Sequence, residues 1–222
     1  MNLTLFDLDG TLLPNDSDHQ FGEFLIRLGW TDGADYQRRN DQFFADYQVG
    51  RLDIHAYVDF ATSAWRDRPA SELAAASARF TEEMRRASVR PAAVVLVQRH
   101  REAGDRMAIV TATNDFITRP IAELFGVPVL IATDLERGAE GRATGRIRGV
   151  PSFREGKIER VDQWLGAEGL RLSDFTRSTF YSDSTNDLPL LEAVSHPVAT
   201  NPSPALERIA RERGWAILNL FK

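Results

Sequence analysis

The chain has 222 residues, of which 43% are hydrophobic and 27% charged, and it contains no cysteine. This length and apolar content suit one domain, or a core domain with an insertion, and argue against a disordered chain. Without cysteine there is no disulfide framework, no thiolate zinc site and no thiol nucleophile, and a net charge of -5 disfavours nucleic acid or an anionic membrane as a partner.

The N-terminal segment carries the first predicted strand. Leu3–Phe6 is a short apolar run that ends abruptly in Asp7-Leu8-Asp9-Gly10-Thr11. This pattern predicts a buried strand that delivers two aspartates at its carboxyl end. The same segment has no basic region and no long apolar run, so we expect no signal peptide. No apolar run reaches about 18 residues, so no membrane-spanning helix is predicted and the expected location is cytoplasmic.

Residues 17–88 show helical rather than strand periodicity. Apolar side chains recur at helical spacing in four successive stretches, which predicts a small helical bundle. Because the bundle interrupts the chain directly after the first strand, we interpret residues 16–88 as a cap inserted over the active edge of a sheet. The four apolar faces lie within Phe21–Leu28, Phe43–Tyr47, Ile54–Ala61 and Leu73–Met84.

From Pro91 onward, predicted strands and helices alternate. Alternation of this kind predicts an α/β fold with a doubly wound parallel sheet, formed here by residues 1–15 and 89–222. Residues 134–154 are rich in Gly and Arg and are consistent with a hairpin, and Pro120 is expected to kink or delay its helix. The predicted strands are 107–110, 127–131, 178–182, 197–200 and 215–218, and the predicted helices are 92–103, 156–165 and those that follow Asn114, Asp187 and Pro204.

Three of these strands end in chemically useful side chains. Ligands of open α/β sheets bind beyond the carboxyl ends of the strands, so these side chains should converge at one edge. A lysine at the start of the helix between the second and third groups should join them. The side chains are Asp7 and Asp9, then Thr111, then Asp183 with Asn186 and Asp187, and the lysine is Lys157.

The order and spacing of these residues resemble the four motifs of the haloacid dehalogenase-like hydrolase superfamily. Asp7-Leu8-Asp9-Gly10-Thr11 is similar to its first motif, Thr111 to its second, Lys157 to its third, and Asp183 with Asp187 to its fourth. The resemblance covers nearly the whole chain. It implies a Rossmann-like core and a phosphatase that acts on a small-molecule phosphate ester.

The chemistry of phosphate ester hydrolysis accounts for these residue types. A carboxylate such as Asp7 can attack phosphorus and form an acyl phosphate, which divides one difficult displacement into two. Asp9 lies two residues further on, on the same side of an extended chain, and can protonate the leaving alkoxide and later deprotonate water. Several carboxylates beside a phosphate dianion repel one another, so a lysine and a divalent cation are expected.

The resemblance also implies a role for each residue at the metal and the phosphate. Mg²⁺, which prefers oxygen ligands and retains several waters, would be held by Asp7, Asp183 and the backbone carbonyl of Asp9. Asn186 and Asp187 would act outside the inner coordination sphere or through water. The phosphate would be held by Thr111, Ala112 and Lys157.

The helical insertion resembles that of the phosphoserine phosphatase-like branch of the superfamily. By this resemblance Asp16 takes the position of a glutamate that binds the substrate ammonium, and Arg51 is the candidate for the substrate carboxylate. The second motif reads Thr111-Ala112-Thr113 where that branch has Ser-Gly-Gly, and it is similar to the pattern of histidinol-phosphate phosphatases. Histidinol phosphate carries an amine but no carboxylate, which would leave Arg51 without that task.

Other interpretations of the same residues remain open at this stage. Asp7 and Asp9 could begin a turn, Asp183 could cap a helix, and Lys157 could be solvated. A phosphotransferase could use the same aspartyl phosphate, and a non-catalytic phosphate-binding regulator could use the same scaffold. The arginines of the glycine-rich segment are interpreted mainly as a solvated hairpin; they are Arg137, Arg142, Arg146, Arg148 and Arg154.

Overall fold

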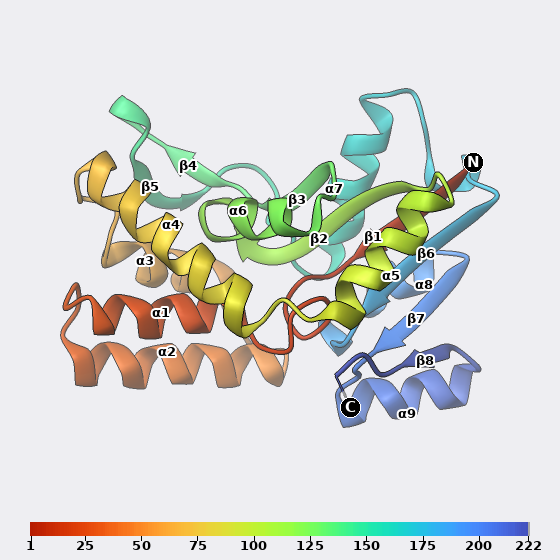
Figure 1. Ribbon diagram of the computed structural model, residues 1–222, viewed down its shortest axis with the longest axis horizontal. Coiled ribbons are helices and arrows are strands. Elements are labelled where there is room, and N and C mark those ends of the chain that lie inside the picture. The colour runs from red at the N-terminus through yellow and green to blue at the C-terminus, as the bar shows by residue number, and fades with distance from the viewer. Residues whose placement is uncertain (222) are drawn as a thin grey trace.

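The computed structural model describes residues 1–221, and a six-stranded sheet forms its centre (Figure 1). Every strand pairing in this sheet is parallel, which confirms the predicted fold class. The spatial order is β3-β2-β1-β6-β7-β8, so the chain winds outward in both directions from β1 and β6. The strands are β1 Asn2–Phe6, β2 Arg106–Asn114, β3 Val129–Thr133, β6 Arg177–Ser182, β7 His196–Thr200 and β8 Ala216–Leu218.

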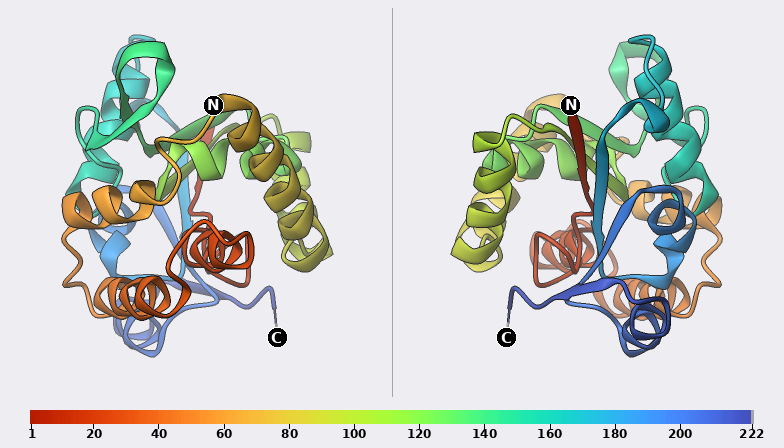
Figure 2. Two further views of the ribbon diagram at one scale, coloured as in Figure 1. Left: turned by 90° about the vertical axis from the view of Figure 1, so that its left-hand side faces the viewer. Right: turned by 90° about the vertical axis from the view of Figure 1, so that its right-hand side faces the viewer.

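Helices cover both faces of the sheet (Figure 2). On β1, Leu3 and Leu5 point into the core on one face while Phe6 points into the core on the other, as the two-residue period of a strand requires. Burial of these apolar faces supplies the main stabilisation of the core. One face is covered by α5 Pro91–Glu102 and α6 Asp115–Phe125, and the other by α7 Glu155–Gly166, α8 Leu188–Ala193 and α9 Pro204–Arg213.

Strand β2 is longer than the sequence predicts. Its regular pairing with β3 ends at Val110, but after an irregularity Asn114 pairs again with Thr133. Asn114 then caps α6, because its Oδ1 accepts a hydrogen bond from the Ile117 N–H at 3.3 Å. The helix therefore begins directly at Asp115 and is not delayed by a proline five residues later.

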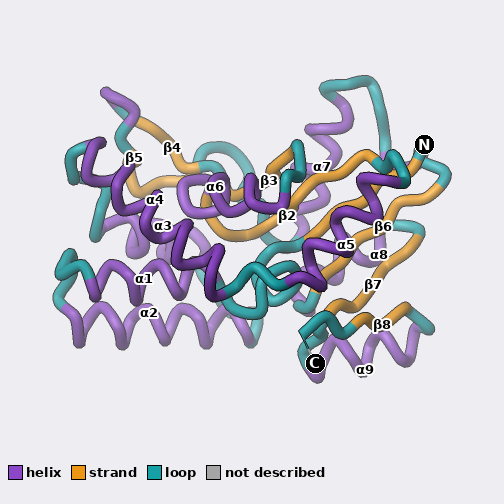
Figure 3. The backbone as a smooth tube through the Cα atoms, viewed as in Figure 1, coloured by secondary structure: helices purple, strands orange, loops and turns teal. Residues whose placement is uncertain are grey.

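Four helices and their loops lie beyond the carboxyl ends of the strands, and we call residues 16–88 the cap (Figure 3). They form α1 Ser17–Arg27, α2 Gly33–Gln48, α3 Ile54–Ser63 and α4 Ala70–Ala87. Aromatic side chains join these helices to α6 of the core. Trp65 stacks on Phe116 at 4.4 Å between ring centroids, and Phe21 meets both Phe80 and Phe116 edge-on.

Residues 134–154 contain the expected hairpin, formed by β4 Leu135–Arg137 and β5 Ala143–Ile147 around a 3-10 turn at Ala139–Gly141. β5 packs against α3 of the cap. The arginines of the hairpin are compensated by nearby acids; Arg146 pairs with Glu136 at 2.6 Å and Arg148 with Asp134 at 3.3 Å. They therefore offer little free positive charge to an anionic substrate.

Two further 3-10 turns, Leu172–Asp174 and Thr185–Asp187, precede β6 and α8 respectively. The second of them carries the acidic motif that follows β6. Within residues 1–221, no helix combines the length and the apolar character that a bilayer span requires.

Candidate active site

Asp7 follows β1 at the point where the strand order reverses. Its backbone N–H donates to the Tyr181 carbonyl at 2.9 Å, so β6 holds it at the edge of the sheet. The side chain is 2% exposed, and its Oδ1 accepts a hydrogen bond from Lys157 Nζ at 2.9 Å. Its Oδ2 is buried and has no hydrogen-bond partner. A buried carboxylate oxygen without a partner costs free energy, unless a ligand or a cation interacts with it.

Lys157 lies in the first turn of α7 and is fully buried. Its ammonium group contacts Asp187 at 2.7 Å as well as Asp7, and Ser182 Oγ donates to the same Asp187 carboxylate at 2.7 Å. Burial alone would lower the pKa of Lys157, but the two carboxylates outweigh it and the pKa is raised. The lysine is therefore charged, and it positions the nucleophile candidate at the same time.

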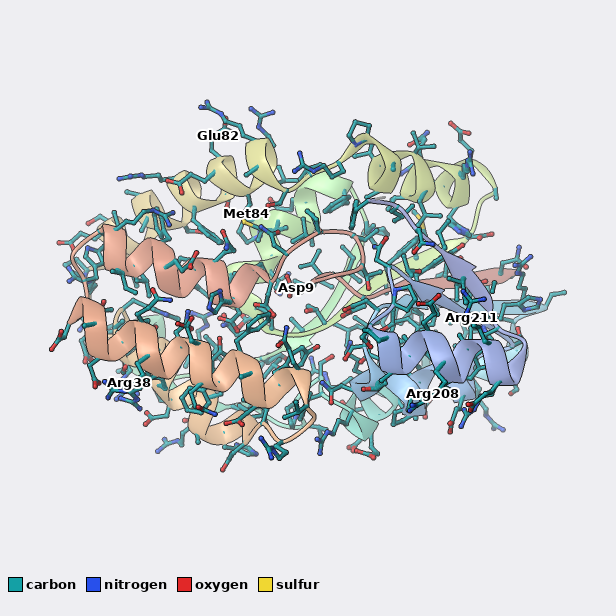
Figure 4. All side chains as sticks on the ribbon, turned by 90° about the horizontal axis from the view of Figure 1, so that it is seen from below. Asp9, Arg38, Glu82, Met84, Arg208 and Arg211 are labelled. Atoms are coloured by element: carbon teal, nitrogen blue, oxygen red, sulfur yellow. The ribbon has the colours of Figure 1, made fainter. Side chains whose placement is uncertain are left out.

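Asp9 faces the cap side of the same edge. Its two carboxylate oxygens accept hydrogen bonds from the Ser17 N–H at 2.7 Å and from Thr113 Oγ1 at 2.9 Å. Burial, with a contribution from the nearby Asp16, raises the pKa of Asp9 to about 7. Figure 4 places Asp9 near the middle of the molecule, between the helices of the cap and α9. A carboxyl group with this pKa can exchange a proton near neutral pH.

Asp183, which follows β6, lies close to the backbone turn after Asp9. Thr11 Oγ1 donates to its Oδ1 at 3.0 Å. A Cβ on Gly10 would lie only 2.4 Å from Asp183 Oδ2, and Gly10 adopts a positive φ of 74°, so only glycine fits here. Asn201 Nδ2 donates to the carbonyl of Gly10 at 3.0 Å and thereby supports the turn.

The acidic residues at this edge fit a hard cation. Burial raises the pKa of Asp183 well above its usual value, and the charges of Asp7 and Asp187 raise it further. Lys157 compensates only part of this negative charge. Within the described residues, no group of three or more His, Cys, Asp or Glu side chains is arranged to hold a metal ion by itself. The carboxylates available here are oxygen donors, which suit a hard divalent cation.

A cavity of about 40 Å³ extends from Asp7 and Asp9 into the cap. Thr111 and Ala112 line its core side, and Asp16 lines its cap side. Asp16 caps α1, because its carboxylate accepts the His19 N–H at 2.8 Å, and burial raises its pKa. The structure therefore brings Asp7, Asp9, Thr111, Ala112 and Asp16 together around one space.

Two of the predicted site residues have other surroundings. Arg51 is 76% exposed, does not line the cavity and has Asp46 as its acidic partner at 3.8 Å. Arg51 follows Gly50, which adopts a positive φ of 69°. A contact between Arg51 and a substrate carboxylate therefore stays a prediction that the cavity lining does not support. Asn186 Nδ2 donates to the Tyr47 carbonyl at 2.9 Å, so this side chain joins the fourth motif to the cap rather than facing the other acids.

Several residues around the cavity are absent from the sequence-based candidates. Thr113 lies two residues after Thr111 in an extended strand, so the strand period could have placed both on one side. Asp18, Tyr47 and Tyr57 line the cap portion of the cavity. No sequence signal marks them, because helical periodicity shows that a face is buried without showing what it meets.

Comparisons with known proteins agree with this geometry. The family model of haloacid dehalogenase-like hydrolases matches residues 4–192. A histidinol-phosphatase of Neisseria meningitidis serogroup C is 44% identical over 218 residues, which is 98% of each chain. A phosphoserine phosphatase of Mycobacterium tuberculosis is 32% identical over 222 residues, covering 96% of this chain and 68% of its own length.

Solved structures lead to the same conclusion about the fold. A protein of unknown function from Bordetella pertussis Tohama I matches with a TM-score of 0.93 and 52% identity over 99% of both chains. A substrate-bound phosphoserine phosphatase shares the fold, with a TM-score of 0.69 and 19% identity over 99% of this chain and 92% of its own.

The parallel sheet and the acid–lysine cluster at its switch point define a hydrolase of the haloacid dehalogenase type, and the chain belongs to that family. It is an enzyme of the phosphatase kind, in agreement with the two curated relatives. The non-catalytic alternative left open by the sequence is therefore not retained.

Proposed function

We propose that this protein is a Mg²⁺-dependent phosphomonoesterase that acts on a small phosphorylated metabolite through an aspartyl-phosphate intermediate. The observation that carries this proposal is the buried, unpaired Oδ2 of Asp7, which belongs to a side chain lining the cavity. The other carboxylate oxygen is held by Lys157. One oxygen is thus fixed and the other is available to attack phosphorus, as a nucleophilic carboxylate requires.

The reaction proceeds in two displacements. Asp7 attacks phosphorus, the bond between phosphorus and the ester oxygen breaks, and Asp9 donates its proton to the departing alkoxide. Asp9 then removes a proton from water, the water oxygen attacks phosphorus, and the bond to Asp7 breaks to release phosphate. Lys157 offsets the charge on Asp7 throughout, and Thr111 supplies a hydroxyl at the same edge of the cavity.

The metal would be held by the side chains of Asp7 and Asp183 and by the backbone carbonyl of Asp9. When bound, Mg²⁺ supplies positive charge that offsets the carboxylates and the phosphate. Asp187 would not coordinate the metal directly. Its carboxylate instead accepts hydrogen bonds from Lys157 Nζ and Ser182 Oγ. Thr11 orients Asp183 through its hydroxyl.

The buried carboxylates predict how the metal-free protein responds to pH. Burial raises the pKa of Asp7 and of Asp9 from 3.8 to about 7, so within that range the folded chain binds more protons than the unfolded chain. Stability therefore falls as pH rises through this window. We expect the melting temperature without divalent cation to fall by about 5 °C or more between about pH 6 and about pH 8, which corresponds to about 2 kcal/mol.

Mg²⁺ should restore most of this loss at the higher pH and have less effect at the lower pH, because protonated carboxyl groups do not need the cation. Thermal unfolding in chelator, with and without added Mg²⁺, measures both effects. Asp183→Asn serves as the control, since it removes one of the charges and should weaken the response to Mg²⁺. A melting temperature that ignores both pH and Mg²⁺ would contradict the proposed metal site.

The substrate we propose is a phosphorylated amino alcohol, with histidinol phosphate as the first candidate. Asp16 lines the same cavity as Asp7, and no lysine or arginine occurs among the described residues that line it. A substrate ammonium would supply the missing positive charge beside Asp16. The curated relative at 44% identity is a histidinol-phosphatase, which supports this candidate over an ester without an amine.

A cavity of this volume holds only a few waters, so we expect the cap or its side chains to shift when the ester enters. Hydrolysis of histidinol phosphate, phosphoserine and p-nitrophenyl phosphate, each with Mg²⁺ and with chelator, tests the proposed function. Absence of Mg²⁺-dependent hydrolysis of every ester would refute it.

The role of Asp16 has a separate test. Asp16→Asn retains a side-chain oxygen that can cap α1, so the helix should persist while the charge is lost. We expect kcat/KM for histidinol phosphate to fall by about 10-fold or more, since hydrogen bonds to charged groups contribute about 1.5–3 kcal/mol. The amine-free p-nitrophenyl phosphate should lose less. Equal losses on both esters would defeat the assignment of Asp16 to an amine.

A further inference from the structure

The cap portion of the cavity contains a second buried acid that the proposed reaction does not use. Asp18 lines the cavity, lies in the first turn of α1 and is 7% exposed. Its carboxylate accepts a hydrogen bond from the Tyr57 hydroxyl. Burial raises its pKa well above the usual value, and the charge of Asp16 adds to this effect.

No cationic side chain offsets Asp18 within the described residues that line the cavity. His19 also lines it, but its Nε2 lies 2.8 Å from Asp41 Oδ1 on the outer side of the cap. A carboxylate in such surroundings needs either a proton or a donor from a ligand. Tyr57 supplies one donor, and a carboxylate accepts several. The Asp18 carboxylate can therefore accept a further hydrogen bond from a donor within the cavity.

Aromatic side chains line the same cavity as this acid. Phe43 and Tyr57 are in edge contact at 5.3 Å between ring centroids, and Phe44 lies 4.9 Å from the His19 ring. All of these rings line the cavity, together with Tyr47. Flat apolar walls of this kind favour a flat ring over a branched or strongly hydrated group.

Asp7 lines the same cavity, and its buried, unpaired Oδ2 is an independent indication that a ligand binds there. A single molecule that reaches from Asp7 into the cap would therefore place its phosphate at Asp7, its amine near Asp16 and its far end between the aromatic walls, next to Asp18. The far end must be flat and must carry an N–H donor to satisfy that carboxylate.

We propose that Asp18, Tyr57 and Phe43 form a second recognition site in the cap, which binds a flat nitrogen heterocycle of the substrate through a ring N–H that donates to Asp18. This site rests on the proposed function, since it extends the cavity that begins at the nucleophile. It narrows the substrate class from amino alcohol phosphates in general to those that bear an N–H heterocycle. Asp18 selects the substrate and takes no part in the displacement at phosphorus.

The first test compares two esters that share the phosphate and the amine but differ in the ring. The ratio of kcat/KM for histidinol phosphate to that for phosphoethanolamine should fall by at least about 10-fold in Asp18→Asn, the loss expected for one hydrogen bond to a charged group. Asp46→Asn is the matched control, because it removes the same charge from the cap at an acid paired with Arg51 outside the cavity. The Asp46→Asn variant should have the same ratio of the two kcat/KM values as the wild type. An unchanged ratio in Asp18→Asn, or an equal loss on both esters, would overturn the proposal.

A second test needs no variant and therefore does not depend on the folding of Asp18→Asn. Histidinol, phenylalaninol and ethanolamine are titrated into the wild-type protein by calorimetry. Histidinol should bind most tightly, phenylalaninol less tightly because its ring has no N–H, and ethanolamine least. Equal binding of histidinol and phenylalaninol would contradict the proposal that Asp18 binds a ring N–H. Since no phosphate is involved, this result is separate from any failure to detect hydrolysis, which would count against the proposed function instead.

Discussion

Replacing Asp7 by asparagine should reduce Mg²⁺-dependent hydrolysis of every phosphate ester by at least about 1,000-fold, because a neutral amide cannot form the acyl phosphate. The fold should persist. The amide oxygen can still accept a hydrogen bond from Lys157, which also keeps Asp187 as a partner at 2.7 Å. The loss would therefore come from the chemistry and not from unfolding.

Two measurements make this result specific to the nucleophile. Acid quenching of the wild type during turnover, followed by mass spectrometry of the N-terminal peptide, should detect one phosphoryl group on Asp7, and the variant should show none. Asp41→Asn is the matched control, since Asp41 is an exposed acid on α2 that does not line the cavity. Unchanged hydrolysis by Asp7→Asn would sink the nucleophile assignment.

Replacing Lys157 by methionine should damage both stability and activity. The ammonium group is fully buried between Asp7 and Asp187, so its removal leaves two buried carboxylates without their shared cation. Loss of one partner of a buried ion pair costs about 3–5 kcal/mol. For a chain of this size, the melting temperature should fall by about 10 °C. Hydrolysis should also fall by at least about 100-fold, because Asp7 loses the group that positions it.

A double variant separates the two effects. Adding Asp187→Asn to Lys157→Met removes one of the uncompensated charges, so part of the lost stability should return while hydrolysis stays low. Melting temperatures and rates of the two single variants and the double variant complete the cycle. If the double variant is no more stable than Lys157→Met alone, the charge cluster does not account for the destabilisation.

Local sequence patterns were enough to predict the core of this structure. Apolar runs that end in Asp7, Thr111 and Asp183 predict strands with polar carboxyl ends, and alternation with helices predicts a parallel sheet. Such a sheet brings those ends to one edge wherever the intervening chain runs. The proximity of Lys157 to Asp7 follows from the same rule, since α7 begins at that edge.

The boundaries and surroundings were less predictable. β2 continues to Asn114, although its apolar run stops at Val110, because pairing with β3 resumes at Thr133 after an irregularity. Asn186 turns toward the cap because the end of α2 offers it the Tyr47 carbonyl. Arg51 does not line the cavity; its side chain is exposed and lies 3.8 Å from Asp46. The first two outcomes depend on a partner that is distant in the chain.

The sequence by itself therefore determined the fold class, the family and the acid–lysine set, since these depend on strand periodicity and on residues at strand ends. Only the tertiary structure decided which cap side chains line the cavity that contains Asp7. Asp18 and Tyr57 lie on different helices, α1 and α3, and they meet at the cavity because of how those helices pack. Helical periodicity specifies a buried face, but the packing of one helix on another specifies what that face contacts.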